Sequence, residues 1–193
     1  MKDALLGLLV AGLTGVLLLG SCGLTGNGEE EKSNADSTYF RSTLNGKEAW
    51  GATDTRAVFF DNAGSRSLTL AGDTSHEEYA PYTEQLGFGV RFRGTDTYSL
   101  LRNGGEVAYF ESDGDALIAS YHPSESTDPS AHQLTITSYD STTGVLEGTF
   151  RTTVVVDSAE RVSEPGEPPR RRPDTLRFTD GEFRVKVRDL RDR

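Results

Sequence analysis

The chain is 193 residues long, carries a formal net charge of −10 at pH 7 and contains one cysteine. Nucleic acid is not expected as a partner, because its phosphates repel an acidic protein. One cysteine also excludes a disulfide within the chain and a zinc site built from several cysteines. A domain of this length must therefore be stabilised by its hydrophobic core.

The first 21 residues have the composition of a signal peptide. Lys2 supplies a positive charge, and the segment from Ala4 to Gly20 is apolar apart from Thr14. This segment is shorter than the roughly 20 residues that a membrane-spanning helix needs. We therefore expect cleavage between Ser21 and Cys22. The alternatives are an uncleaved anchor helix and ordinary secretion with a free thiol.

The residues around the expected cleavage point are Leu19-Gly20-Ser21-Cys22. They resemble the lipobox of bacterial lipoproteins, in which the cysteine sulfur takes a diacylglyceryl group and the freed amine is acylated, commonly with palmitate. This resemblance implies that Cys22 is lipidated and that several acyl chains hold the protein at a membrane of the cell envelope. Gly23 follows the cysteine, and by resemblance to Gram-negative lipoproteins this favours the outer membrane.

Residues 22–38 are rich in Gly, Asn, Ser and Glu and contain few large apolar side chains. Such a segment cannot bury enough surface to fold by itself, so we expect a lipidated N-terminus followed by a disordered tether. Residues 39–193 then form a single antiparallel β domain.

Short alternating runs separated by turn residues predict the strands of this domain. They cover residues 39–44, 56–60, 67–72, 85–93, 97–101, 106–112, 117–121, 133–139, 145–156 and 175–187, with Trp50 on a short return strand and a polar loop over 73–83. Asn45-Gly46 predicts a tight hairpin turn. A change of parity along the last run predicts a bulge at Asp180-Gly181. About ten strands without a helical period predict an all-β fold, either an antiparallel β-sandwich or a flattened β-barrel.

One face of the run 85–93 carries Gly87, Gly89, Arg91 and Arg93, whereas the apolar residues share the other face. Two glycines on one face leave space for a neighbouring side chain or for a ligand. Because strand glycines commonly mark a close approach, we expect them to pack beneath a bulky residue such as Trp50.

Residues 157–174 form a long polar loop that contains several prolines and the triplet Arg170-Arg171-Arg172. The triplet could contact an anion, such as a lipopolysaccharide phosphate, or an acidic partner. The alternative is a solvated loop whose arginines pair with Glu164 and Glu167, and we favour this alternative.

Three groups of residues form a recognisable set, namely Phe40-x-x-x-Leu44-Asn45-Gly46 with Trp50, Leu134 to Asp140 with Gly144 and Gly148-Thr149-Phe150, and Asp180 to Phe183. They resemble the opening hairpin, the central hairpin and the closing strand of an uncharacterised family of Gram-negative envelope lipoproteins. The resemblance implies a lipid anchor and a single all-β domain, and it supplies no catalytic residues.

No pattern of residues indicates catalysis, a metal site or a cofactor. His76, His122 and His132 lack the spacing of metal ligands, so we expect solvated loop histidines. Asp113-Gly114-Asp115 near Glu111 could suggest calcium, but a hairpin turn is the favoured interpretation.

We therefore expect a lipid-anchored envelope protein that is not an enzyme and whose β domain binds a ligand or another envelope component. An envelope hydrolase acting on cell-wall or glycan material, and a structural spacer, are the alternatives. Convergent carboxylates in a concave site would favour the hydrolase. An apolar cavity inside the barrel would favour a small ligand, and an exposed apolar face would favour a protein partner.

Overall fold

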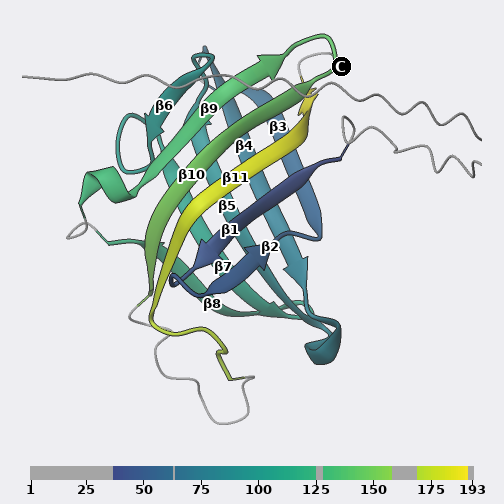
Figure 1. The fold of residues 1–193 in the computed structure, drawn as a ribbon, viewed down its shortest axis with the longest axis vertical. Coiled ribbons are helices and arrows are strands. Elements are labelled where there is room, and N and C mark those ends of the chain that lie inside the picture. The colour runs from purple at the N-terminus through teal and green to yellow at the C-terminus, as the bar shows by residue number, and fades with distance from the viewer. Residues whose placement is uncertain (1–36, 63, 125–127, 158–168, 191–193) are drawn as a thin grey trace, which may run out of the picture. The chain divides into compact units, whose positions relative to one another are not determined.

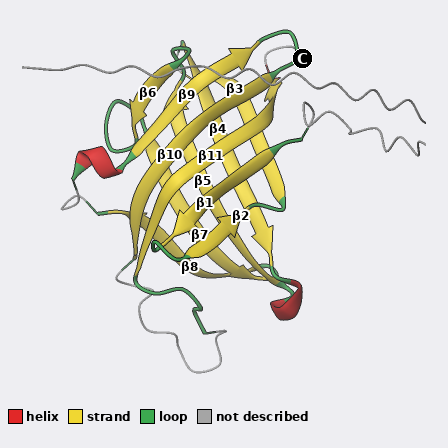
Figure 2. Ribbon diagram, in the orientation of Figure 1, coloured by secondary structure: helices red, strands yellow, loops and turns green. Residues whose placement is uncertain are grey.

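The computed structural model describes residues 37–62, 64–124, 128–157 and 169–190. Within these residues the fold is all-β, as predicted, and two single-turn 3-10 helices, η2 (Glu77–Tyr79) and η3 (Pro129–Ala131), interrupt the strands (Figure 2). The strands are β1 (Tyr39–Leu44), β2 (Glu48–Gly51), β3 (Asp54–Asn62), β4 (Ser65–Ser75), β5 (Tyr82–Arg91), β6 (Asp96–Ser99), β7 (Glu106–Asp113), β8 (Ala116–Pro123), β9 (Gln133–Asp140), β10 (Val145–Val156) and β11 (Thr175–Asp189).

Seven strands close into a ring of hydrogen-bonded neighbours. The order is β11, β3, β4, β5, β7, β8, β10 and back to β11. Every pair in the ring is antiparallel except β3 and β11, which pair in parallel over Val187 to Asp189. This pair departs from the expected antiparallel sheet. The direction of β11 is already set by its long antiparallel pairing with β10, so β11 reaches β3 running the same way.

The remaining strands extend the ring into two layers. β1 pairs with the earlier part of β11 and carries β2, while β9 pairs with the earlier part of β10 and carries β6. In Figure 1, β1, β2, β6, β9, β10 and β11 form the layer nearer the viewer, and β3, β4, β5, β7 and β8 form the layer behind. The domain is thus a flattened barrel.

The interior of the barrel is filled by the inward side chains of both layers. Phe40 lies at its centre, with ring centroids 4.8–6.3 Å from those of Trp50, Phe88, Phe150 and Phe183. Because alternate residues of β1, β5, β7 and β10 are buried, large apolar side chains meet between the layers, as in other small barrels.

The predicted bulge and the first predicted turn are confirmed. Phe150 lies opposite Gly181 and Thr152 lies opposite Phe178, so β11 has one extra residue in this interval, and Asp180 adopts a positive φ of 51°. Asn45 and Gly46 have φ values of 53° and 69°, as a tight hairpin turn requires.

Several strand boundaries differ from the sequence-based expectation. The polar loop predicted over 73–83 is wrong at both ends, because β4 continues to Ser75 and β5 begins at Tyr82. Asp73 pairs with Gln85 and Ser75 pairs with Thr83, so the two strands continue as a regular hairpin. The sequence did not indicate this because the side chains here are polar and give no hydrophobic alternation. In addition, β6 ends at Ser99 instead of continuing through Leu101.

Several expectations lie outside the described residues. These are the signal peptide, Cys22, the tether as far as residue 36, and residues 158–168 of the long loop. Among the described residues, no helix has the length and hydrophobicity needed to cross a membrane.

Candidate functional site

A groove of about 800 Å³ lies on the outer face of the rear layer of the barrel. Outward residues of β4, β5 and β7 line it, together with the connection between β6 and β7, the end of β8 and the start of η3. A site of this size is within the range of small-molecule pockets, about 300–1,000 Å³.

The floor of the groove is a row of very small residues. Ala71 of β4 lies opposite Gly87 of β5, and Gly87 lies opposite Ala108 of β7, so three neighbouring strands carry no side chain larger than a methyl group at this level. A Cβ at Gly87 would meet only the carbonyl oxygens of Ala108 and Leu70, each 4.0 Å away. The expectation that the glycines pack beneath Trp50 is therefore wrong, because Trp50 is buried on the opposite, inner face of the sheet.

Larger side chains form the walls. Phe110 of β7 and His122 of β8 stand on one side, with their rings edge to face and their centroids 6.5 Å apart. Leu101 and Arg102 approach from the connection between β6 and β7, and Glu106 reaches over Gly89, where a Cβ would lie 3.7 Å from a carboxylate oxygen. The site thus combines a flat apolar floor with an aromatic and a polar rim.

Two opposite charges on this rim have no partner among the residues that the structure describes. Within the described residues, neither the Arg102 nor the Glu106 side chain makes a hydrogen bond or an ion pair. Nearby Arg56, by contrast, is paired with Asp73 at 2.8 Å. Arg102 and Glu106 are therefore available to a ligand.

A second polar cluster closes the lower end of the barrel. Glu84 and Glu111 are 2 % and 0 % exposed. The Tyr82 hydroxyl lies between them, 3.1 Å from Glu84 Oε1 and 2.7 Å from Glu111 Oε2. Tyr121 also donates to Glu111 at 2.5 Å, and the Trp50 indole donates to Glu84 at 3.0 Å. Both buried carboxylates are thus held by aromatic donors that belong to the core.

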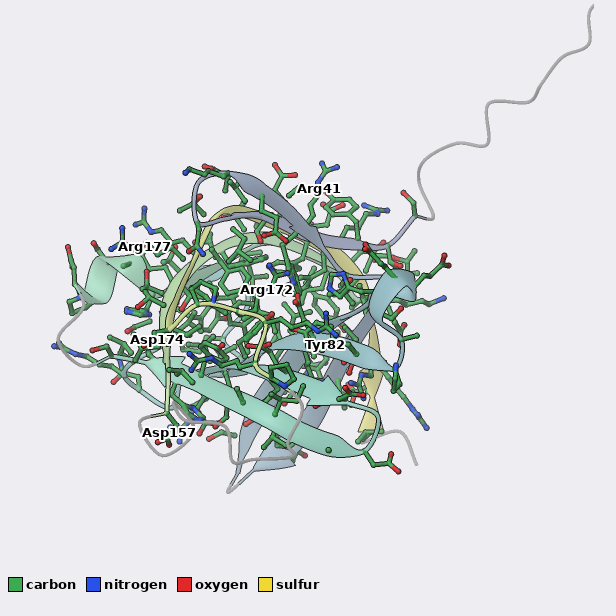
Figure 3. All side chains as sticks on the ribbon, turned by 90° about the horizontal axis from the view of Figure 1, so that it is seen from below. Arg41, Tyr82, Asp157, Arg172, Asp174 and Arg177 are labelled. Atoms are coloured by element: carbon green, nitrogen blue, oxygen red, sulfur yellow. The ribbon has the colours of Figure 1, made fainter. Side chains whose placement is uncertain are left out.

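Arg172 completes this cluster. Its guanidinium binds Glu84 through Nε and Nη2, at 2.6 and 2.9 Å, and binds the half-exposed Glu48 through Nη1 at 2.8 Å. The backbone N–H groups of Arg171 and Arg172 donate to Glu111 at 2.9 and 3.3 Å. Figure 3, which views the barrel from below, shows Arg172 near the middle of the opening, with Tyr82 beside it.

Burial and the charges in this cluster both shift the pKa values of its members. Burial alone would raise the pKa of Glu84, but the hydrogen bonds and charge of Arg172, together with Tyr109 and Trp50, outweigh burial and lower it. Burial, reinforced by the neighbouring carboxylates, raises the pKa values of Tyr82 and Tyr121. Glu84 is therefore an ion pair partner and the tyrosines are neutral donors.

The structure places the three arginines singled out from the sequence in different surroundings. Arg170 pairs with Asp174, the Arg171 guanidinium lies 4.9 Å from the ring centroid of Tyr82, and Arg172 is mostly buried between Glu84 and Glu48. Arg170 and Arg172 thus pair with carboxylates of the domain itself, and their side chains are only 16 % and 12 % exposed, so the expectation of a solvated loop is wrong for these two residues. The alternative partners Glu164 and Glu167 lie outside the described residues.

The histidines do not converge. His76 lies 3.4 Å from Glu84, and His122 lines the groove. His132 is fully buried with Nδ1 3.1 Å from Thr152 Oγ1, so the expectation of a solvated histidine is wrong there.

Asp113 and Asp115 flank a turn at Gly114, while Glu111 points into the barrel end. The described residues contain no cluster of three or more His, Cys, Asp or Glu side chains suited to a metal ion.

No family model, curated protein or solved structure matches the chain.

Only part of the groove had a signal in the sequence. Gly87 and Gly89 were visible because they interrupt the polar face of an alternating strand. Ala71 and Ala108 had no signal of their own, because they become part of the site only through the registers of β4, β5 and β7.

Proposed function

We propose that the chain is a lipid-anchored protein of the bacterial cell envelope whose β domain binds a ligand in the groove and does not act as an enzyme. The observation that carries this proposal is the groove itself. The small residues of its floor leave a hollow on the outer surface of the barrel, whereas the interior of the barrel is filled by its own side chains.

The partners of the buried carboxylates favour a binding protein over a hydrolase. Glu84 and Glu111 converge, but their oxygens accept hydrogen bonds from the tyrosines, the tryptophan and the Arg172 segment. A general acid in a hydrolase needs a raised pKa, whereas the pKa of Glu84 is lowered. These groups instead suit a structural closure of the barrel end.

The anchor is supported by the sequence of the leader. The lipobox-like residues before Cys22 resemble those of bacterial lipoproteins, and Gly23 favours the outer membrane. Cys22→Ser should abolish labelling by radioactive palmitate in cells that express the full chain. Ser21→Ala, which keeps a small residue at the cleavage point, should retain the label. Labelled Cys22→Ser protein would refute the lipidation site.

Binding in the groove can be tested without knowing the ligand. Full-length protein purified in detergent would be screened with a mixture of small organic fragments by ligand-observed NMR. Gly87→Val adds a branched side chain to the floor, and there is space around its Cβ, so the fold should be kept while the bound fragments are lost. Thr83→Val is the matched control, since Thr83 is an exposed residue of β5 outside the groove. Fragments that bind equally well to Gly87→Val would contradict the proposal.

A further inference from the structure

We infer that the groove binds a short oligosaccharide, one or two pyranose rings long. This inference rests on the proposed function, because it names the chemical class of the ligand for the same site. It is carried by three features of the groove, namely its flat floor, the composition of its rim and the pairing of the strands beneath it.

The floor and one wall match the apolar face of a sugar ring. Ala71, Gly87 and Ala108 form a level surface across three strands. The partly exposed ring of Phe110 stands beside this surface and packs edge to face with the His122 ring. A pyranose presents a flat face of C–H groups, which packs on small apolar residues and on an aromatic ring.

The rim matches the hydroxyl groups around the same ring. Each sugar hydroxyl both donates and accepts a hydrogen bond, so it can use the Arg102 guanidinium as a donor and the Glu106 carboxylate as an acceptor. Both side chains lack partners within the described residues. Thr69 and Gln85 add a hydroxyl and an amide at the edge, although Gln85 also donates to Asp73 at 2.5 Å. Hydrogen bonds to charged groups are stronger than neutral ones.

Other classes of ligand fit less well. An acyl chain would cover Arg102 and Glu106 without pairing them, and burial of an unpaired charge is costly. An extended peptide usually binds by adding a strand to a free sheet edge. β4 and β5 are each paired on both sides along the floor, so a strand could be added only at the three residues Glu106 to Ala108 of β7, which pair with β5 alone. A polyanion would be repelled by Glu106 and by the net charge of −10.

The size of the groove sets the length of the ligand. About 800 Å³ accommodates a drug-sized molecule, and a disaccharide is of that size. Because the groove lies on an outer face, a longer glycan could continue beyond it, with only one or two rings in contact with the floor.

The test uses the full-length protein in detergent and four defined probes. These are N,N′-diacetylchitobiose, cellobiose, octanoate and an N-acetylated, C-amidated trialanine. Saturation-transfer NMR should detect at least one of the two disaccharides. Its dissociation constant should rise at least tenfold in Gly87→Val and severalfold in Phe110→Leu, and it should stay unchanged in Thr83→Val. Thermal unfolding of each variant verifies that it is folded.

The possible outcomes separate the ligand class from the proposed function. Octanoate or trialanine bound in the groove, with no disaccharide bound, would overturn the oligosaccharide while leaving groove binding intact. Absence of binding by all four probes at millimolar concentration would also overturn the oligosaccharide, and the fragment screen would then decide separately whether the groove binds any ligand. Disaccharide binding that is equal in the wild type and in Gly87→Val would place the sugar elsewhere and contradict the inference.

Discussion

The guanidinium of Arg172 donates two hydrogen bonds to the carboxylate of Glu84 at the lower end of the barrel, with Nε 2.6 Å from Oε1 and Nη2 2.9 Å from Oε2. The two residues are 88 positions apart in the sequence, and both side chains are largely buried. This contact joins the segment before β11 to the wall formed by β5. It therefore stabilises the closure of the barrel end.

Arg172→Met should lower the free energy of unfolding by about 3–5 kcal/mol, because it leaves the buried Glu84 carboxylate without its counter-ion. Glu48→Gln removes the other partner of Arg172, but the Glu48 side chain is 52 % exposed, so its loss should cost less than about 1 kcal/mol. Urea unfolding measures both values. Adding Glu84→Gln to Arg172→Met should restore part of the stability, since an amide needs no counter-ion. Equal losses from Arg172→Met and Glu48→Gln would contradict this account.

The lowered pKa of Glu84 predicts a loss of stability in acid. The unfolded carboxyl titrates near 4.5 and the folded one below that value. The folded state thus binds fewer protons in this interval, so the stabilisation is present above pH 4.5 and is lost as the pH falls through the folded pKa. The measurement is the free energy of unfolding between pH 6 and pH 3. Glu84→Gln should flatten this dependence, whereas Glu182→Gln, at an exposed ion pair with Arg41, should leave it nearly unchanged.

His132 predicts a separate dependence at higher pH. Burial lowers the pKa of the imidazole from 6.5, although the nearby Asp128 acts in the opposite direction. The neutral ring is favoured in the folded state, so this contribution to stability is present above pH 6.5 and is lost as the pH falls through the folded pKa. Unfolding in urea at pH 7.5, 6.5 and 5.5 should show the loss in the wild type and in His122→Asn. It should be absent in His132→Asn, and an equal slope in all three proteins would refute the assignment.

Local patterns in the sequence were sufficient for features that depend on a single strand. The parity change between Phe178 and Phe183 located the bulge. Alternation in residues 85–93 identified β5 and its glycine face, although the strand begins at Tyr82 and ends at Arg91. Polar residues 73–75 carry no such alternation of apolar side chains, so the end of β4 was missed. The signal is hydrophobic periodicity, and it disappears wherever the outer and inner faces are both polar.

Contacts between residues far apart in the chain could not be predicted from the sequence. Nothing in the sequence next to Arg172 indicates Glu84, and nearby Glu164 and Glu167 seemed better partners because they are close in the chain. The parallel contact between β11 and β3 likewise has no local signature, since it follows from where β10 and β11 end. The groove required both kinds of information: glycines visible in one strand and the registers that place Ala71 and Ala108 beside them.

The contrast between two strand glycines tests the difference between a packing contact and an open floor. A Cβ at Gly148 would collide with the carbonyl oxygen of Thr135 and would lie 2.5 Å from Phe183 Cζ. Gly148→Ala should therefore destabilise the domain by about 1–3 kcal/mol or more, because neither the backbone of β9 nor the buried Phe183 ring can move freely.

Gly87→Ala is the matched substitution on the groove floor, where a Cβ has only contacts at 4.0 Å. It should raise the free energy of unfolding by up to about 1 kcal/mol, because alanine restricts the unfolded chain more than glycine does. Urea unfolding of the two variants beside the wild type provides the measurement. A loss of stability in Gly87→Ala comparable to that in Gly148→Ala would mean that Gly87 is packed against a neighbour and that the groove lacks an open floor. A gain of stability in Gly87→Ala together with a loss in Gly148→Ala would show that the glycine at 87 is unnecessary for the fold. The open space above Gly87 would then be the reason for its presence.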